Sequence, residues 1–255
     1  MFVLFLIFLV IFILILSLKK DRQPPLKTHR KLSSKGQQGE NITSYNMRVG
    51  LDSSQYRQFN NVIIETKNGT TQIDHIVISR FGIFIIETKN LTGWIFGDRN
   101  SPKWTQILCH EKYLFQNPLR QTYRQKKTLA WFFNIKESTI HTVICFVGDC
   151  EFKTDMPENI QMDDPSGYIK DFNILKIPQG KADYLSEKLN HYINNTEITL
   201  SDHIRSLHQR HNSTNICPSC GARLLVRTVK KGPRAGTQFL GCANYLQCRF
   251  SRNIE

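Results

Sequence analysis

The sequence lacks the signatures of several common enzyme classes. It has no P-loop, no glycine fingerprint for a dinucleotide and no nucleophile triad, so no motif supports an enzyme of those classes. Its first 18 residues also lack charged side chains, and its middle segment, residues 37–210, has almost no net charge. The net charge of +13 is concentrated in residues 19–36 and 211–255. Such basic flanks favour polyanions, either anionic lipid or nucleic acid, and a role in solubility is the alternative.

Residues 1–18 contain no charged side chain and are nearly all Leu, Ile, Val or Phe. As a helix this run is ~27 Å long, close to the ~30 Å apolar core of a bilayer. No basic leader precedes it and no small-residue cleavage motif follows it, unlike a cleaved signal peptide. A buried core helix is the alternative. We predict a single-pass anchor in the cell membrane.

Residues 19–34 are rich in basic side chains, contain two prolines and have little apolar content. This composition predicts a juxtamembrane linker that lies near anionic headgroups. The positive-inside rule then places the N-terminus outside and residues 19–255 in the cytoplasm.

The seven cysteines are odd in number and unevenly spaced. Cys217 and Cys220 enclose a Pro-Ser pair, and Cys242 and Cys248 form a second close pair. Four thiolates in two pairs suit structural tetrahedral Zn²⁺, and a short tail has too little core to fold without it. A disulfide pair is the alternative. We predict a small zinc ribbon with four cysteine ligands over 214–255, reached through a linker over 196–213 that is polar and either helical or flexible.

The middle of the chain has the pattern of an α/β domain. Asn68-Gly69 is a hairpin turn signal, and Asn117-Pro118 is typical of a helix start. We predict helices over 36–49 and from 118, and strands over 62–66, 71–79, 83–89 and 139–147. This order predicts a mixed sheet flanked by helices over 35–150, with an extension of the fold to 195 as the alternative.

Charged residues interrupt the most apolar strands of this domain. Glu87 and Lys89 are two residues apart and therefore share a strand face. If the preceding hairpin centres on Arg80 and Phe81, Asp74 lies opposite Glu87, with Cβ atoms ~4.5–5.5 Å apart. Two carboxylates at that distance can share a divalent cation, whereas a slip of one residue would separate them. A structural salt-bridge cluster is the alternative.

The residues around these charges resemble the nuclease-related domain (NERD) of the PD-(D/E)xK superfamily. Asp74 and Glu87-Thr88-Lys89 match the D…ExK signature of that superfamily. Five ordered segments carry the closer likeness: Gly39-Glu40, Gln72-Ile-Asp-His75, Gly82-Ile-Phe-Ile-Ile-Glu-Thr-Lys-Asn90, Gly93-Trp-Ile-Phe-Gly97 and Asn117-Pro-Leu-Arg-Gln121. The likeness implies a PD-(D/E)xK-like sheet and phosphodiester hydrolysis that depends on Mg²⁺ or Mn²⁺.

The resemblance also implies roles for particular residues. Asp74, Glu87 and the Thr88 carbonyl would hold the metal, which would acidify a bound water. Lys89 would orient that water or stabilise the transition state. Glu40 is implied as an additional acid and Gln121 as a further site residue, with a solvated helix residue and a capping residue as the respective alternatives. His75 alternates to the opposite face, which predicts packing or support of the site rather than metal ligation.

The tail resembles the C-terminal zinc fingers of bacterial type I topoisomerases. Cys217-Pro-Ser-Cys-Gly221, Phe239-Leu-Gly-Cys-Ala-Asn-Tyr245 and Cys248-Arg-Phe250 carry the likeness, although Leu246 replaces the usual proline. It implies a grip on single-stranded DNA, and protein contact is the alternative. The predicted nucleic-acid contacts of the tail are Arg223, Arg227, Lys230, Lys231, Arg234, Phe239, Tyr245, Arg249, Phe250 and Arg252. In the helix from 118, Arg120, Arg124 and Lys127 are predicted to contact phosphates.

Two functions fit these features. The first is a membrane-anchored, metal-dependent nuclease that acts on DNA. The second is a catalytically inactive module that holds nucleic acid near the membrane. The presence of all the metal-binding acids and the lysine favours the first, because a degenerate relative would most easily lose one of them.

Overall fold

The computed structural model describes residues 34–66 and 68–254 of the chain. The predicted anchor over 1–18 and nearly all of the predicted linker over 19–34 lie outside these residues. Within them, no helix is both long and apolar enough to cross a membrane. The first described residue, Ser34, caps helix α2 (Lys35–Gly50) by accepting a hydrogen bond from the Gln37 amide.

A mixed sheet forms the centre of the fold, as the sequence predicted. Its strands run in the order β1-β2-β3-β7-β9, with antiparallel pairing from β1 to β3 and parallel pairing from β3 onward. Their bounds are β1 (Arg57–Thr66), β2 (Gly69–Ser79), β3 (Gly82–Asn90), β7 (Ile140–Val147) and β9 (Ile160–Met162). The strand predicted over 62–66 thus begins at Arg57, because its polar first residues pair through their backbone and leave no apolar pattern.

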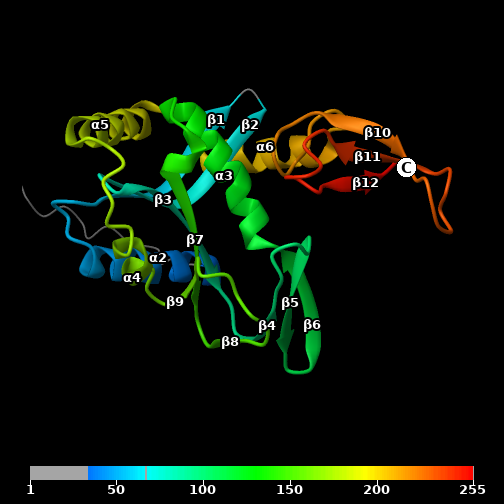
Figure 1. The fold of residues 1–255 in the computed structure, drawn as a ribbon, viewed down its shortest axis with the longest axis horizontal. Helices are drawn as coiled ribbons and strands as arrows, with labels where there is room; N and C mark the ends of the chain where they lie inside the picture. Colours follow the sequence, from blue (N-terminus) through cyan, green and yellow to red (C-terminus); the bar gives the residue numbers. More distant parts are fainter. Residues whose placement is uncertain (1–33, 67, 255) are drawn as a thin grey trace, which may run out of the picture. The chain divides into compact units, whose positions relative to one another are not determined.

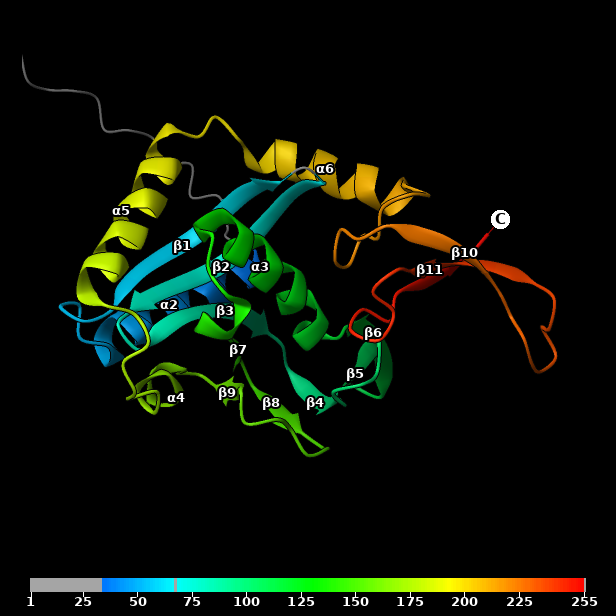
Figure 2. The same ribbon diagram turned by 45° about the horizontal axis from the view of Figure 1, so that its top comes forward.

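Helices cover both faces of this sheet (Figure 2). Met47 of α2 and Ile169 of α4 (Ser166–Lys170) pack on one face, against Val77, Phe84 and Ile86. The opposite face carries α3 (Pro118–Phe133) and α5 (Gln179–Asn195). Asn117 caps α3 as predicted, since its side chain accepts a hydrogen bond from the Leu119 amide at 3.0 Å.

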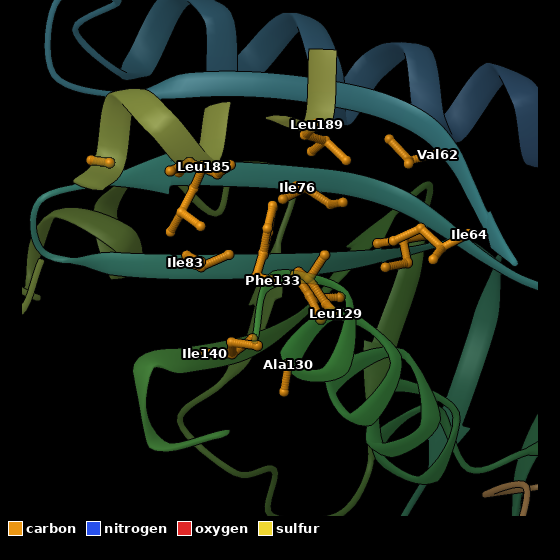
Figure 3. Packing of buried hydrophobic residues seen from close by; sticks show 14 of the residues in the cluster. Val62, Ile64, Ile76, Ile83, Leu129, Ala130, Phe133, Ile140, Leu185 and Leu189 are labelled. Atoms are coloured by element: carbon orange, nitrogen blue, oxygen red, sulfur yellow. The ribbon is translucent and has the colours of Figure 1, made fainter. Parts of the chain in front are cut away.

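The larger apolar core lies between the sheet and these two helices (Figure 3). Ile83 and Ile85 of β3 meet Leu129 and Phe133 of α3, while α5 adds Leu189. Each such side chain contributes roughly 1.5–3 kcal/mol when it is fully buried. Since α5 is part of this core, the fold extends beyond residue 150. The extension to residue 195 was the alternative drawn from the sequence.

The remaining strands form two smaller sheets (Figure 1). One has the order β6-β5-β4-β8 and is built from β4 (Gly93–Phe96), β5 (Lys103–Leu108), β6 (Glu111–Gln116) and β8 (Cys150–Phe152). The other is the C-terminal ribbon of β10 (Leu224–Thr228), β11 (Gln238–Cys242) and β12 (Ser251–Asn253). A single 3₁₀ turn, Glu137–Thr139, precedes β7.

The segment predicted as a linker over 196–213 contains an ordered helix, α6 (Leu200–Asn212). It lies between the β1–β2 hairpin and the ribbon (Figure 1). The Thr70 amide donates to Ser206 Oγ at 2.9 Å, and His203 Nδ1 lies 2.8 Å from Thr70 Oγ1. The helix was one of the two alternatives drawn from the sequence, but its docking was not predicted, because these buried contacts are polar and its inner face carries no apolar stripe.

Candidate active site

The hairpin between β2 and β3 has the register that the sequence predicted. His75 pairs with Ile86 and Ser79 with Gly82, so the turn centres on Arg80 and Phe81. Backbone pairing between the two strands ends at His75. Asp74, which precedes His75 in β2, contacts β3 through its side chain instead. Its Oδ2 accepts a hydrogen bond from the Thr88 amide at 2.9 Å. The strands therefore separate at Asp74, on the sheet face that also carries Glu87.

Glu87 is buried, with 2% of its surface exposed, and both of its carboxylate oxygens are engaged. The Lys89 ammonium lies 2.5 Å from Oε1, and the Gln125 amide donates to Oε2 at 2.8 Å. Lys89 also donates to Gln121 Oε1 at 3.0 Å. The structure thus brings Glu87, Lys89 and Gln121 together, with Gln125 as an additional member of the cluster.

The position of this polar cluster follows from a division within α3. The C-terminal half of the helix presents Leu129 and Phe133 to the apolar part of the sheet. Its N-terminal half presents Gln121 and Gln125, which are one turn apart and therefore share a face. In β3 the order is reversed, because the apolar Ile85 comes before Glu87 on the same strand face. The polar half of the strand therefore lies against the polar half of α3, which supplies hydrogen-bond partners for a buried carboxylate in an otherwise apolar sheet.

The carboxyl groups of the site repel one another. Burial raises the pKa of Asp74 well above its ordinary value, and the negative charge of Glu87 raises it further, against the lowering effect of the Thr88 amide. Burial also raises the pKa of Glu40, with a further contribution from Glu87. Lys89 lowers both pKa values only in part. The site would therefore be stabilised by more positive charge.

His75 lies on the other face of the sheet, where it supports the site from behind. Its Nδ1 is 2.8 Å from Asn60 Oδ1, and its Nε2 is 3.2 Å from Thr88 Oγ1. Thr88 in turn donates to Thr43 of α2 at 3.1 Å. Burial lowers the pKa of His75 to about 4, so the imidazole is neutral at physiological pH. This chain fixes Thr88, the residue whose amide holds Asp74.

The acidic residues and their hydrogen-bond partners on α3 line a cavity of about 870 Å³. One wall carries Glu40, Asp74, Glu87, Lys89 and Gln121. The opposite wall comes from α6 and the ribbon, through His203, Leu207, Arg210, His211, Pro218, Ser219, Arg249, Phe250 and Ser251. The ribbon therefore helps to enclose the cavity. Of this wall, the sequence predicted only Arg249 and Phe250, as nucleic-acid contacts. It also missed Gln125 of α3, which its spacing of four residues from Gln121 could have identified.

The predicted nucleic-acid contacts divide into two groups. Arg120 and Arg124 line the cavity, but Arg124 is buried, and its guanidinium donates to Thr71 Oγ1 at 3.0 Å and to the Asn68 carbonyl at 3.2 Å. It is thus a structural residue as well as a cavity residue. Lys127 is not brought to the cavity, because it pairs with Glu137 at 2.7 Å on the side of α3 away from it.

Among the predicted ribbon contacts, Arg249 and Phe250 line the cavity, whereas the others lie outside its lining. Arg227 donates to the Cys242 carbonyl at 3.3 Å and lies 5.6 Å from the ring centroid of Tyr245. Lys230 and Lys231 are exposed in the loop after β10, and Phe239 of β11 is half-buried. These residues therefore form a surface distinct from the enclosed site.

The four cysteines of the ribbon converge in the manner expected of zinc ligands. The Sγ atoms of Cys217, Cys220, Cys242 and Cys248 all lie within 4.8 Å of one another. Two of the pairs are separated by 3.7 Å and 3.4 Å. A tetrahedron with Zn–S bonds of ~2.3 Å has edges of about 3.8 Å, so the donors fit Zn²⁺. Gly221, with φ +74°, makes the tight turn after Cys220.

The acidic site differs from this cysteine cluster. Among residues 34–66 and 68–254, the cysteine cluster is the only set of three or more Cys, His, Asp or Glu donors gathered so closely. The acidic site nevertheless offers the oxygen donors that Mg²⁺ prefers. Mg²⁺ commonly uses one or two carboxylates and retains several waters, so Asp74, Glu87 and the Thr88 carbonyl suffice as a donor set.

Comparison with known families defines the class of each region. Residues 35–147 match the family model of the nuclease-related domain, and residues 214–255 match that of the topoisomerase DNA binding C4 zinc finger. The chain therefore carries a NERD domain followed by a topoisomerase-type zinc ribbon, which confirms both resemblances seen in the sequence. The part of the chain that contains α5 and α6 lies between the two matches.

Individual relatives add little about activity. An uncharacterised protein of Bacillus anthracis is 44% identical over 98 residues, which make up 38% of this chain and 46% of that protein. The match thus spans about half the length of this curated relative. A solved structure of a protein of unknown function aligns over 70% of this chain and 97% of its own, with 14% identity and a TM-score of 0.24. That likeness is too weak to support any argument.

Proposed function

We propose that this protein is a nuclease that hydrolyses phosphodiester bonds of DNA with Mg²⁺ or Mn²⁺ as cofactor. The observation that carries the proposal is the convergence of Asp74, Glu87, Lys89 and Gln121 on one cavity. The NERD match supports the same conclusion. The ribbon supports nucleic acid as the substrate class.

Asp74 and Glu87, with the Thr88 carbonyl, would hold the metal, which when bound acidifies a water and neutralises charge on the phosphate. Gln125 keeps the Glu87 carboxylate in place, and the Thr88 amide does the same for Asp74. Lys89, held between Glu87 and Gln121, is positioned to stabilise negative charge that develops on the phosphate. Glu40 is an acid of the same cavity that would contact the metal or its water.

The membrane anchor remains part of the proposal. The uncharged run of residues 1–18 and the basic segment that follows support a single-pass protein whose nuclease domain faces the cytoplasm. The substrate would then be DNA that approaches the inner membrane surface.

The test uses the full chain, purified in detergent, and a labelled DNA offered in single- and double-stranded form with Mg²⁺ or Mn²⁺. We expect cleavage by the wild type and its loss, by about 10³-fold or more, in Asp74→Ala, because the metal loses a direct ligand. Asp155→Ala is the matched control, since Asp155 is exposed and outside the cavity. Equal cleavage by wild type and both variants would point to a contaminating nuclease, whereas equal loss in both variants would point to unfolding.

The second candidate function is binding without cleavage. The ion pair of Glu87 with Lys89 favours it, because a satisfied Glu87 has less need of a metal. Wild-type protein that binds DNA but leaves it intact with every divalent metal would replace the nuclease by this binding module.

A further inference from the structure

Arg210 of α6 has an environment that its structural role does not explain. Only 6% of its surface is exposed, and its Nε and Nη1 atoms are buried without a hydrogen-bond partner. Buried charges in proteins are normally paired or hydrogen-bonded, because removing a charge from water costs several kcal/mol. Within the described residues no acidic side chain forms an ion pair with Arg210.

A second arginine makes this arrangement still less favourable. Burial, together with the positive charge of nearby Arg124, lowers the pKa of Arg210 to about 10. Arg210 is therefore charged at neutral pH. Arg124 has compensating partners in Thr71, the Asn68 carbonyl and the nearby thiols of Cys217 and Cys220. Arg210 has no comparable anionic neighbour among the residues described.

The position of Arg210 indicates which ligand would compensate its charge. Arg210 lines the same cavity as Asp74 and Glu87, on the opposite wall. His203, Ser206 and Arg210 are spaced by three and four residues, so they share one face of α6. The contacts of His203 and Ser206 with Thr70 hold that face against the hairpin. The arginine is therefore carried by a docked helix rather than by a free tail.

We propose that Arg210 binds a backbone phosphate of the nucleic acid that enters the cavity. The proposal rests on the proposed function for its ligand class. A guanidinium offers two parallel donors to phosphate oxygens, and the Arg210 side chain is part of the cavity lining. Since Arg210 lies outside both family matches, the segment between the NERD domain and the ribbon contributes to the site.

The experiment measures binding of the full chain to a short single-stranded DNA by fluorescence anisotropy, without divalent metal, over a series of salt concentrations. We expect Arg210→Gln to weaken binding about tenfold and to reduce the slope of log K against log salt by ~0.7, the value for one phosphate contact on a single strand. Arg205→Gln is the matched control. It removes the same charge from the same helix, but Arg205 is 69% exposed, pairs with Asp202 and lies outside the cavity lining.

Equal slopes for Arg210→Gln, Arg205→Gln and wild type would overturn the proposal. Thermal unfolding and zinc content show whether α6 and the ribbon remain folded. If Arg210→Gln fails to fold, Arg210→Lys decides: an unchanged unfolding midpoint with weaker DNA binding supports the role, and unchanged binding excludes the two-donor guanidinium contact on which the proposal rests. Cleavage is scored separately. If wild type cuts DNA and Arg210→Gln binds DNA as wild type does, only the inference about Arg210 is refuted. If wild type never cuts DNA and Arg210→Gln loses binding, only the nuclease activity is refuted.

Discussion

The acidic site and the cysteine cluster are both suited to metals, but they depend on the rest of the fold in different ways. Asp74 and Glu87 extend from strands whose neighbouring residues belong to a large apolar core. The cysteines form much of their own core, with Leu224 and Leu240 as the main buried aliphatic side chains around them. The sheet can therefore form without metal, whereas the ribbon needs metal to fold. A metal at the acidic site would serve chemistry, and the zinc serves structure.

The largest expected effect tests the structural side of this comparison. Cys217→Ser removes one thiolate ligand, and structural zinc contributes about 10–16 kcal/mol to the folding of small zinc domains. We expect loss of zinc and of protected amides in β10 to β12, while the main sheet retains its protection. Zinc analysis and hydrogen exchange followed by mass spectrometry measure both effects.

Cys109→Ser is the control for this variant, since Cys109 is exposed and distant in sequence from the ribbon. Unfolding of the main sheet together with the ribbon in Cys217→Ser would contradict the comparison. It would mean that the ribbon supports the NERD fold rather than merely covering its cavity.

The next prediction concerns the acidic site, where we expect a substitution to increase stability rather than to reduce it. Asp74→Asn removes a carboxylate whose pKa is raised by burial and by Glu87, yet keeps an oxygen that can accept from the Thr88 amide. We expect the variant to be more stable than wild type at neutral pH without divalent metal, by on the order of 1 kcal/mol. Urea unfolding measures the difference in the free energy of unfolding.

The pH dependence of this gain follows from the direction of the pKa shift. A carboxyl group with a raised pKa in the folded state destabilises that state as pH rises from its unfolded value, about 4, through the folded value. The gain in Asp74→Asn should therefore be absent at low pH, grow over that window and then level off. Mg²⁺ should stabilise wild type more than the variant. A gain that is independent of pH, or one shared by Asp155→Asn, would exclude electrostatic repulsion as its cause.

The sequence predicted the acidic wall of the cavity much better than the opposite wall. The turn at Arg80 and Phe81 determines a register, and alternation along the strand then determines which side chains share a face. In α6 the apolar residues Leu200 and Ile204 recur at helical spacing but are exposed, and the buried positions are His203, Ser206 and Arg210. Apolar periodicity identifies the buried face of a helix only when that face is apolar, so the docking of α6 through polar contacts was not predicted.

The small second sheet was missed for a related reason. The residues of β6 are mostly exposed, and β4 and β8 are short, so none shows a sustained alternation. The docking of the ribbon could not be predicted either. It depends on isolated contacts between distant segments, such as Asn68 Nδ2 with the Gly221 carbonyl at 2.8 Å.

The smallest expected effect examines how firmly the two regions are joined. Tyr123 of α3 donates to Gln247 Oε1 of the ribbon at 2.8 Å, in an exposed position. Tyr123→Phe removes this hydrogen bond, together with the contact between the hydroxyl and Lys127, and keeps the ring beside Lys127. We expect a loss of about 0.5–1.5 kcal/mol in ribbon docking, read as faster hydrogen exchange around residues 244–248 with zinc content unchanged.

Tyr45→Phe is the control for this change, because Tyr45 is exposed on α2 and far in sequence from the ribbon. A small effect of Tyr123→Phe is expected because other contacts remain, including that of Arg252 with the Ser213 carbonyl at 2.7 Å. Complete release of the ribbon would mean that its docking depends on a single bond. The second wall of the cavity would then be a movable cover, and enclosure of the acidic site would be a conformational step rather than a fixed property of the fold.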